Sequence, residues 1–183
     1  MLAGLWGSRY LRRFARAKDG TTAVEFALIA APFFMLLAAI FETSAIYFAS
    51  STLENAVSDA SRQIRTGQAQ FANMTAAQFR QLICNGIDAM LKCDTSLAVD
   101  VRSFNDFQQV SFPNEINPDG TLKNDQQFTP GGAGDVVVVR VFYQWPIITP
   151  WVGGGLSNMT GNVRLIESVT TFRNEPFGSL LAN

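Results

Sequence analysis

The amino-acid sequence predicts an α+β protein with a long helix near its amino terminus, a second helix and a small antiparallel sheet. Three observations support this fold class. A long apolar run comes first, helical spacing of apolar residues continues beyond it, and segments with strand-like alternation fill the second half. The 183 residues are enough for one globular domain with additional segments.

The apolar run extends from Ala23 to Phe41 and contains a single charged residue, Glu25. As a helix it would be about 28 Å long, which is close to the hydrocarbon thickness of a membrane. Pro32 removes one backbone donor and predicts a kink or local loosening. We expect a membrane helix that includes Phe26, Leu28, Pro32, Phe33, Phe34, Leu36, Leu37, Ile40 and Phe41.

A basic arm precedes this run. Residues 1–20 carry five basic side chains against one acidic side chain, Asp19. Because basic residues are enriched on the cytoplasmic side of membranes, the arm favours a cytoplasmic amino terminus over nucleic-acid binding. A cleaved secretory signal is the competing interpretation, but its apolar core would be shorter and no good cleavage site follows Phe41. We therefore expect a retained, single-pass helix.

The helix is expected to continue past the apolar run as one element from about Thr22 to Thr66. Apolar residues recur there at helical spacing, with charged residues between them, and Gly67 ends the pattern. Glu42, Thr43 and Ser44 are expected to mark the outer membrane interface. The recurring apolar residues are Leu53, Val57, Ala60 and Ile64, and no flexible linker separates them from Phe41.

A second helix is predicted over Thr75–Leu91. Thr75 and Gln78 fit a capping box, and the buried stripe would consist of Phe79, Leu82, Ile83, Ile87 and Met90. Cys84 and Cys93 fit no redox or zinc spacing. Outside the cytoplasm two such cysteines pair, so we expect a structural disulfide at the end of this helix.

About four antiparallel strands are expected after the second helix. Leu97–Phe104 alternates between apolar and polar residues, and Gln109–Phe112 is a candidate partner. Asn117–Leu122 reads as a turn. Asp135–Trp145 is apolar on both faces and therefore central, and Val163–Phe172 is the last strand. The Pro- and Gly-rich loop between these two strands, around Trp145–Leu156, carries apolar residues that suit a partner surface.

The composition argues against an enzyme or a metalloprotein. The chain has no histidine, which removes histidine-dependent triads and histidine-ligated metals. Carboxylates such as Asp100 and Glu167 are not convincingly placed together, so no catalytic residue, cofactor or metal site is predicted. Residues 114–125 are rich in oxygen ligands without the spacing of a calcium loop, and a solvated turn is favoured there.

The spacing around Gly20 carries the functional prediction. A basic leader, Gly20, four residues, Glu25, Phe26 and an apolar helix resemble the processing site of type IV prepilins. That resemblance implies that a prepilin peptidase cuts between Gly20 and Thr21. More narrowly, residues 12–41 resemble the TadE family of pilin-like proteins of the tight-adherence (Tad/Flp) pilus, and the ending Thr170–Phe177 is similar to the end of that family.

The resemblance implies a minor pseudopilin with a pilin-like fold. It would be matured by the prepilin peptidase and take part in priming or assembling an adhesive pilus. The implied partners are other pilin-like subunits, the Tad inner-membrane machinery and the lipid bilayer, with no nucleic acid. The implied location is the bacterial inner membrane, with residues 1–20 as a cytoplasmic leader, 21–66 as the helix and 67–183 as a periplasmic domain.

Cleavage would give Glu25 a partner. The new α-amino group at Thr21 is largely cationic at neutral pH and lies one helical turn away. Pairing of these charges, within one subunit or between two, partly offsets the cost of a carboxylate near lipid. The alternative is a membrane-anchored periplasmic binding or adhesion domain with an uncleaved leader, which leaves the Gly20–Glu25 spacing to coincidence.

Overall fold

A computed structural model describes residues 20–87, 91–93, 95–149, 151 and 155–178. The chain divides into two compact units, the first ending at Ile40 and the second comprising Phe41–Asn183. The division of the sequence at residues 20 and 66 into leader, helix and domain stays a prediction.

Helix α2 (Thr21–Arg65) is the longest element and confirms the predicted helix. It continues through Pro32, and its buried residues begin at Glu42. It ends where predicted, because Gly67 adopts a φ of 81°, which is the left-handed conformation that glycine tolerates. A side chain at this position would also overlap the ring of Phe177. A short helix that the sequence did not predict, α3 (Gln68–Phe71), follows.

Helix α4 (Ala76–Ile87) confirms the second predicted helix and its capping box. Gln78 N–H donates to Thr75 Oγ1 at 3.3 Å, and Thr75 N–H donates to Gln78 Oε1 at 2.8 Å. Phe79, Ile83 and Ile87 are buried as expected. The predicted end of the stripe at Met90 lies outside the described residues.

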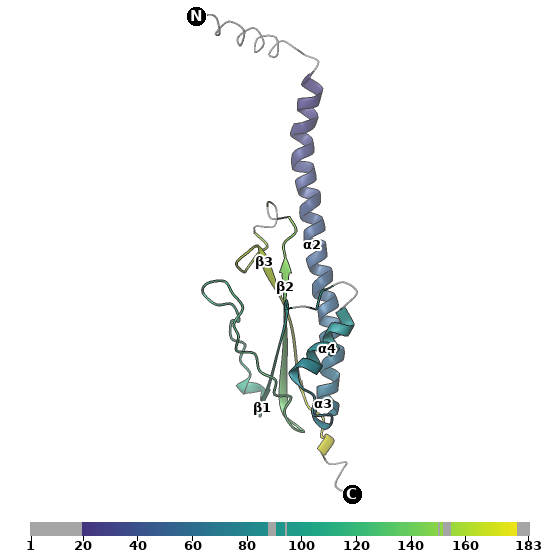
Figure 1. Ribbon diagram of the computed structural model, residues 1–183, viewed down its shortest axis with the longest axis vertical. Helices are drawn as coiled ribbons and strands as arrows, with labels where there is room; N and C mark the ends of the chain where they lie inside the picture. The colour runs from purple at the N-terminus through teal and green to yellow at the C-terminus, as the bar shows by residue number, and fades with distance from the viewer. Residues whose placement is uncertain (1–19, 88–90, 94, 150, 152–154, 179–183) are drawn as a thin grey trace, which may run out of the picture. The chain divides into compact units, whose positions relative to one another are not determined.

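The described residues form one antiparallel sheet of three strands in the order β1-β2-β3. The strands are β1 (Leu97–Phe104), β2 (Val136–Pro146) and β3 (Val163–Arg173), which confirms the predicted positions and the central place of β2. The register pairs Asp100 with Arg140 and Arg140 with Val169. Figure 1 shows the sheet beside the second half of α2.

The prediction of a strand at Gln109–Phe112 is wrong. Residues Phe107–Gln109 form a short 3-10 helix, η2, and the next residues pair with no strand. The reason is that both edges of β1 are taken. One edge pairs with β2 along its whole length, and Val101 exchanges backbone hydrogen bonds of 2.8 Å with Gln127 and Thr129 at the other. The predicted turn at Asn117–Leu122 is confirmed, with Gly120 N–H donating to Asn117 C=O.

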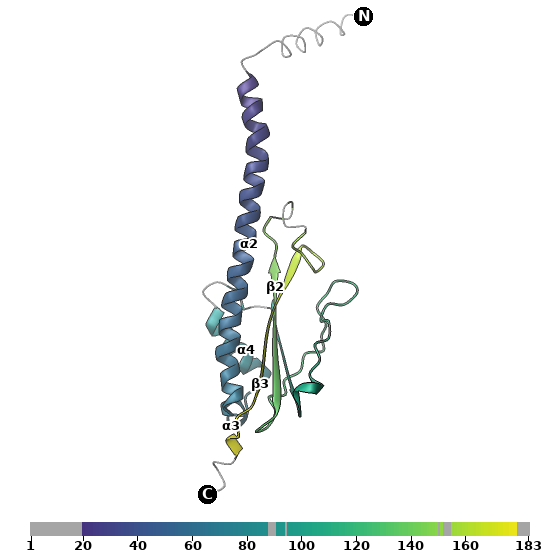
Figure 2. The ribbon, with the colours of Figure 1, turned by 180° about the vertical axis from the view of Figure 1, so that it is seen from behind.

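The hydrophobic core lies between the helices and one face of the sheet. It consists of side chains from α2, α4 and the alternate β2 positions Val137, Val139, Val141 and Tyr143. The segment between β1 and β2 lies on the opposite side of the sheet from α2 (Figure 2).

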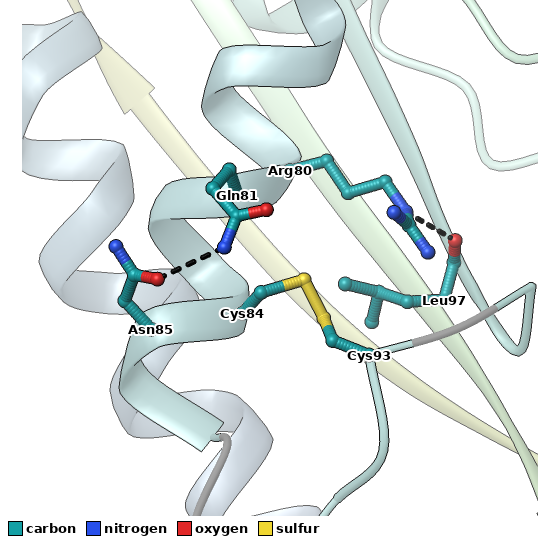
Figure 3. Close-up of a disulfide and its surroundings, with 6 residues drawn as sticks. All are labelled: Arg80, Gln81, Cys84, Asn85, Cys93 and Leu97. Atoms are coloured by element: carbon teal, nitrogen blue, oxygen red, sulfur yellow. Dashed lines mark hydrogen bonds between the residues drawn. A yellow bond between two sulfur atoms is a disulfide. The ribbon is translucent and has the colours of Figure 1, made fainter.

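The predicted disulfide is confirmed. Cys84 in α4 is bonded to Cys93, with a Cα–Cα distance of 5.5 Å. Figure 3 shows the bond beside Arg80, whose Nε donates to the backbone C=O of Leu97 at 3.0 Å. The end of α4 is therefore fastened to the start of β1 by a covalent link and a hydrogen bond.

Candidate functional site

The predicted cleavage segment is uncovered on the described part of the chain. Gly20 is exposed directly before α2, and a Cβ atom built there would meet nothing within 4 Å. Thr21 begins the helix and Glu25 lies four residues further, on the same helical face. Both are exposed, as is Phe26. This geometry leaves room for an enzyme, and the role of these residues in processing stays a prediction.

The apolar residues that follow are turned outward. Among the described residues, α2 is the one helix that is long and apolar enough to cross a membrane, and its apolar window is not buried within the chain. Of the predicted membrane-facing residues, Leu37 is half-buried and the others are exposed. Such a surface is strongly unfavourable in water and therefore indicates contact with lipid or with other apolar helices.

Glu42 directly follows this stretch and is the most heavily hydrogen-bonded carboxylate of the described residues. It is only 3% exposed. Its Oε2 accepts bonds from the backbone N–H of Thr149 and the Thr149 hydroxyl, both at 2.9 Å, and from Ile148 N–H at 3.1 Å. Its Oε1 accepts a bond from Trp145 Nε1 at 3.4 Å. Glu42 therefore fastens α2 to the chain that leaves β2.

The pKa of Glu42 follows from this environment. Burial raises the pKa, because it disfavours the charged form, but the hydrogen bonds from Thr149, Ile148 and Trp145 together outweigh burial and hold the pKa below 4.5. The carboxylate is thus ionised at neutral pH. The expectation that Glu42 marks the outer membrane interface stays a prediction; the structure adds that its charge is enclosed by donors from the end of β2 and the residues that follow.

A second charged cluster lies on the other face of the sheet. Arg140 of β2 is 4% exposed and contacts Glu115 at 2.6 Å and Glu167 at 2.8 Å. It also donates to the backbone C=O of Pro113 at 3.1 Å and lies over the ring of Phe142, 4.9 Å from its centroid. Nearby, Arg102 Nε contacts the buried Asp100 at 2.9 Å, and Asp100 accepts a bond from Gln127 N–H.

This cluster fastens the segment between β1 and β2 to the sheet, because Arg140 contacts Glu115 and Pro113 of that segment. Each guanidinium nitrogen of Arg140 donates to an acceptor within the chain. Glu115, one of the oxygen-rich residues of the region 114–125, is committed to Arg140. Asn114 and Asp119 accept bonds from Ile116 N–H and Thr121 N–H. Within the described ranges, no group of three or more His, Cys, Asp or Glu could hold a metal ion.

The carboxyl-terminal motif joins the end of β3 to the end of α2 and to the segment that precedes β2. Asn174 is buried, and its Nδ2 donates to the backbone C=O of Pro130 and Gly132 at 3.0 and 2.8 Å. Glu175 N–H donates to Arg65 C=O at 2.9 Å, and Phe177 stacks edge-on against Phe71. The predicted resemblance at Thr170–Phe177 therefore falls on a segment with a structural task.

Sequence reasoning missed Glu42, Arg140 and Asn174 as residues that organise the molecule. A partial signal existed for two of them. Glu42 is a carboxylate at the edge of an apolar run, and Arg140 is a charge in the middle of a buried strand. Neither pattern names a partner, because the partners lie far away in the chain. Asn174 offered no signal beyond its place in the resembling motif.

The fold and these surfaces define a class of protein: one apolar, membrane-competent helix that continues into an α+β domain with a disulfide. Comparison with protein families narrows the class. Residues 20–62 match the family of TadE-like proteins, so the chain carries a TadE-like segment that covers most of α2. This match supports a Tad pilus-associated, pilin-like protein. Searches of curated proteins and of solved structures give no match.

Proposed function

We propose that this chain is a minor pseudopilin that is matured by the prepilin peptidase and takes part in priming or assembling a Tad/Flp-type adhesive pilus. The observation that carries the proposal is the TadE-like match, which begins at Gly20, the residue on the amino-terminal side of the proposed cut. The start of α2 at Thr21 and the exposure of Gly20 support it further.

In this function the two ends of α2 have different tasks. The stretch up to Phe41 holds the subunit in the inner membrane, with residues 1–20 in the cytoplasm and the domain in the periplasm. Its exposed apolar side chains are available to pack against the helices of other pilin-like subunits. The Tad inner-membrane machinery then acts on assembled subunits, and the protein itself carries no catalytic activity.

In this proposal Glu25 sets the axial register between neighbouring subunits. Because it lies four residues after Thr21, its carboxylate shares a helical face with the α-amino group that cleavage would create. A carboxylate in hydrocarbon is costly unless it is paired, so a subunit docks where its Glu25 meets an ammonium group of its own or of a neighbour. In this proposal the helical face that carries Thr21 and Glu25 contacts both the bilayer and adjacent subunits.

The deciding experiment is the intact mass and amino-terminal sequence of the protein purified from its native membrane, in strains with and without the prepilin peptidase. We expect a chain that starts at Thr21 only when the peptidase is present. A full-length chain in both strains contradicts the proposal. That result would favour a membrane-anchored periplasmic binding or adhesion domain that keeps its leader.

A further inference from the structure

The segment that follows β2 exposes large apolar side chains at and just after the residues that bond to Glu42. Ile147 is buried in the core, whereas Ile148 is 70% exposed and Trp151 is 94% exposed. From Trp145 to Val163 the sequence contains no charged residue. Exposed tryptophan and isoleucine on an uncharged segment are an unusual surface for a domain that faces only water.

Hydrogen bonds to Glu42 fix where this segment lies along the axis of α2. Its carboxylate accepts bonds from the backbone N–H groups of Ile148 and Thr149, so these residues lie beside position 42 of the helix. Position 42 is the first residue after the apolar stretch, and Phe41 beside it is 73% exposed. If that stretch crosses a bilayer, position 42 lies where hydrocarbon meets the headgroups.

The chemistry of the surface fits that depth. Tryptophan is enriched at the membrane–water interface, because its ring is apolar and its N–H can bond to the headgroup region. Two charges lie beside the segment, and both are bonded within the protein: Glu42 accepts bonds from four donors, and Arg164 donates to the backbone C=O of Leu156 at 2.8 Å. Because residues 145–163 carry no charged side chain, the segment itself brings no charge into the interface.

We propose that Ile148 and Trp151 insert into the interfacial layer of the same bilayer that α2 crosses, and that Glu42 holds them at that depth. These residues give the domain a second membrane contact besides its helix. The inference rests on the proposed membrane anchoring of α2. It implies that a subunit leaving the membrane for a filament must release this contact as well as the helix.

The test uses the quenching of tryptophan fluorescence by brominated lipids, with the full chain reconstituted into phosphatidylcholine vesicles. Replacing Trp6 and Trp145 by Phe leaves Trp151 as the reporter. We expect its emission to be quenched, and more strongly when the bromines lie near the headgroups than when they lie near the ends of the acyl chains.

Two matched reporters separate this inference from the anchoring on which it rests. Both lack all native tryptophans; one carries Phe33→Trp in the apolar stretch and the other carries Phe107→Trp. Phe107 follows β1 at the end of the sheet where Phe104 pairs with Val136, opposite to Trp145. We expect quenching of the first and no quenching of the second.

The quenching results at positions 33, 107 and 151 distinguish the interfacial contact from the anchoring. Quenching at position 33 without quenching at Trp151 overturns the interfacial contact and leaves the anchor standing, and the exposed residues would then be free to bind another subunit. Absence of quenching at position 33 overturns the anchoring and this inference with it. Equal quenching at positions 107 and 151 also overturns the inference, because the effect would not be specific to this surface.

Discussion

At the scale of single residues, Glu42 shows how a buried carboxylate can be stabilised without a cation. It accepts bonds from two backbone N–H groups, one hydroxyl and one indole N–H. Hydrogen bonds to a charged acceptor contribute more than neutral ones, and each donor would be left unsatisfied if the carboxylate were removed. The residue therefore matters for stability although no cation contacts it among the described residues.

Glu42→Ala should lower the free energy of unfolding by about 3 kcal/mol, since it leaves the partly buried N–H groups of Ile148 and Thr149 without their acceptor. Urea unfolding of the full chain in detergent micelles measures this loss. Glu54→Ala is the matched control, because Glu54 is an exposed carboxylate on the same helix. A loss no larger than that of the control would contradict the assigned role.

The pH dependence of stability provides an independent check on Glu42. Its pKa in the folded chain is below 4.5, so the folded state binds this proton less readily than the unfolded state. The stabilisation is therefore complete above 4.5 and is lost as the pH falls through the folded pKa. We expect the stability difference between the wild type and Glu42→Gln to shrink on acidification below 4.5. If the stability difference grew as the pH fell below 4.5, the pKa of Glu42 would be raised in the folded chain and the assignment would be wrong.

At the scale of elements, α4 is held at both ends. The capping box closes its amino terminus, and the disulfide between Cys84 and Cys93 joins its last turn to the start of β1. Gly86 allows a close approach to α2, since a Cβ atom there would lie 2.9 Å from the Cβ of Ala56. The helix is thus fixed along the chain and against its neighbour.

Replacing both cysteines by serine should lower the free energy of unfolding by about 2–3 kcal/mol, as expected for a closed loop of this length. Urea unfolding with and without a thiol reductant measures the effect. The wild type should become as unstable as the variant when reduced, and the variant should not respond. A wild type that is insensitive to complete reduction would show that the bond adds nothing to stability.

The segment between β1 and β2 depends on charges rather than on regular structure. Arg140→Met should destabilise the chain by about 3–5 kcal/mol, because Glu115 would remain buried without its cation. Adding Glu115→Gln to this variant should recover part of the loss. Urea unfolding measures both, and limited proteolysis should cut residues 105–130 first. Arg164→Met serves as the control, since Arg164 at the start of β3 donates to the backbone C=O of Leu156.

At the scale of the whole molecule, one helix serves two environments. Up to Phe41 its side chains are outside any core, and from Glu42 onward its buried face packs into the domain. The change occurs without a break in the helix. In the proposed function the first stretch of α2 contacts the membrane and the second stretch belongs to the domain.

Glu25→Ala should impair pilus assembly far more than membrane insertion, because it removes the charge that pairs with the processed amino terminus while making the helix more apolar. Carbonate extraction of membranes measures insertion, and electron microscopy with surface shearing measures pili. The exposed Glu54→Ala is again the matched control. Normal piliation by the Glu25→Ala strain would contradict the role proposed for this carboxylate.

The elements of this protein were predictable because each has a local signal. Helical spacing defined α2 and α4, alternation defined β1 and β3, and the apolar run Val136–Val139 marked the central strand. The wrong strand at Gln109–Phe112 shows the limit of such signals. Whether a short alternating segment pairs depends on a free sheet edge, and residues 127–129 occupy that edge instead.

By itself, the sequence determined the membrane-competent helix, the pilin-like spacing from Gly20 to Glu25, the two-helix and sheet architecture and the cysteine pair. These depend on residues that are close together in the chain. The tertiary structure alone decided the roles of Glu42 and Arg140. The partners of Glu42 are 103 to 107 residues away, and those of Arg140 are 25 and 27 residues away. A buried charge is stabilised only by the donors or opposite charges that folding brings to it, and no local pattern specifies them.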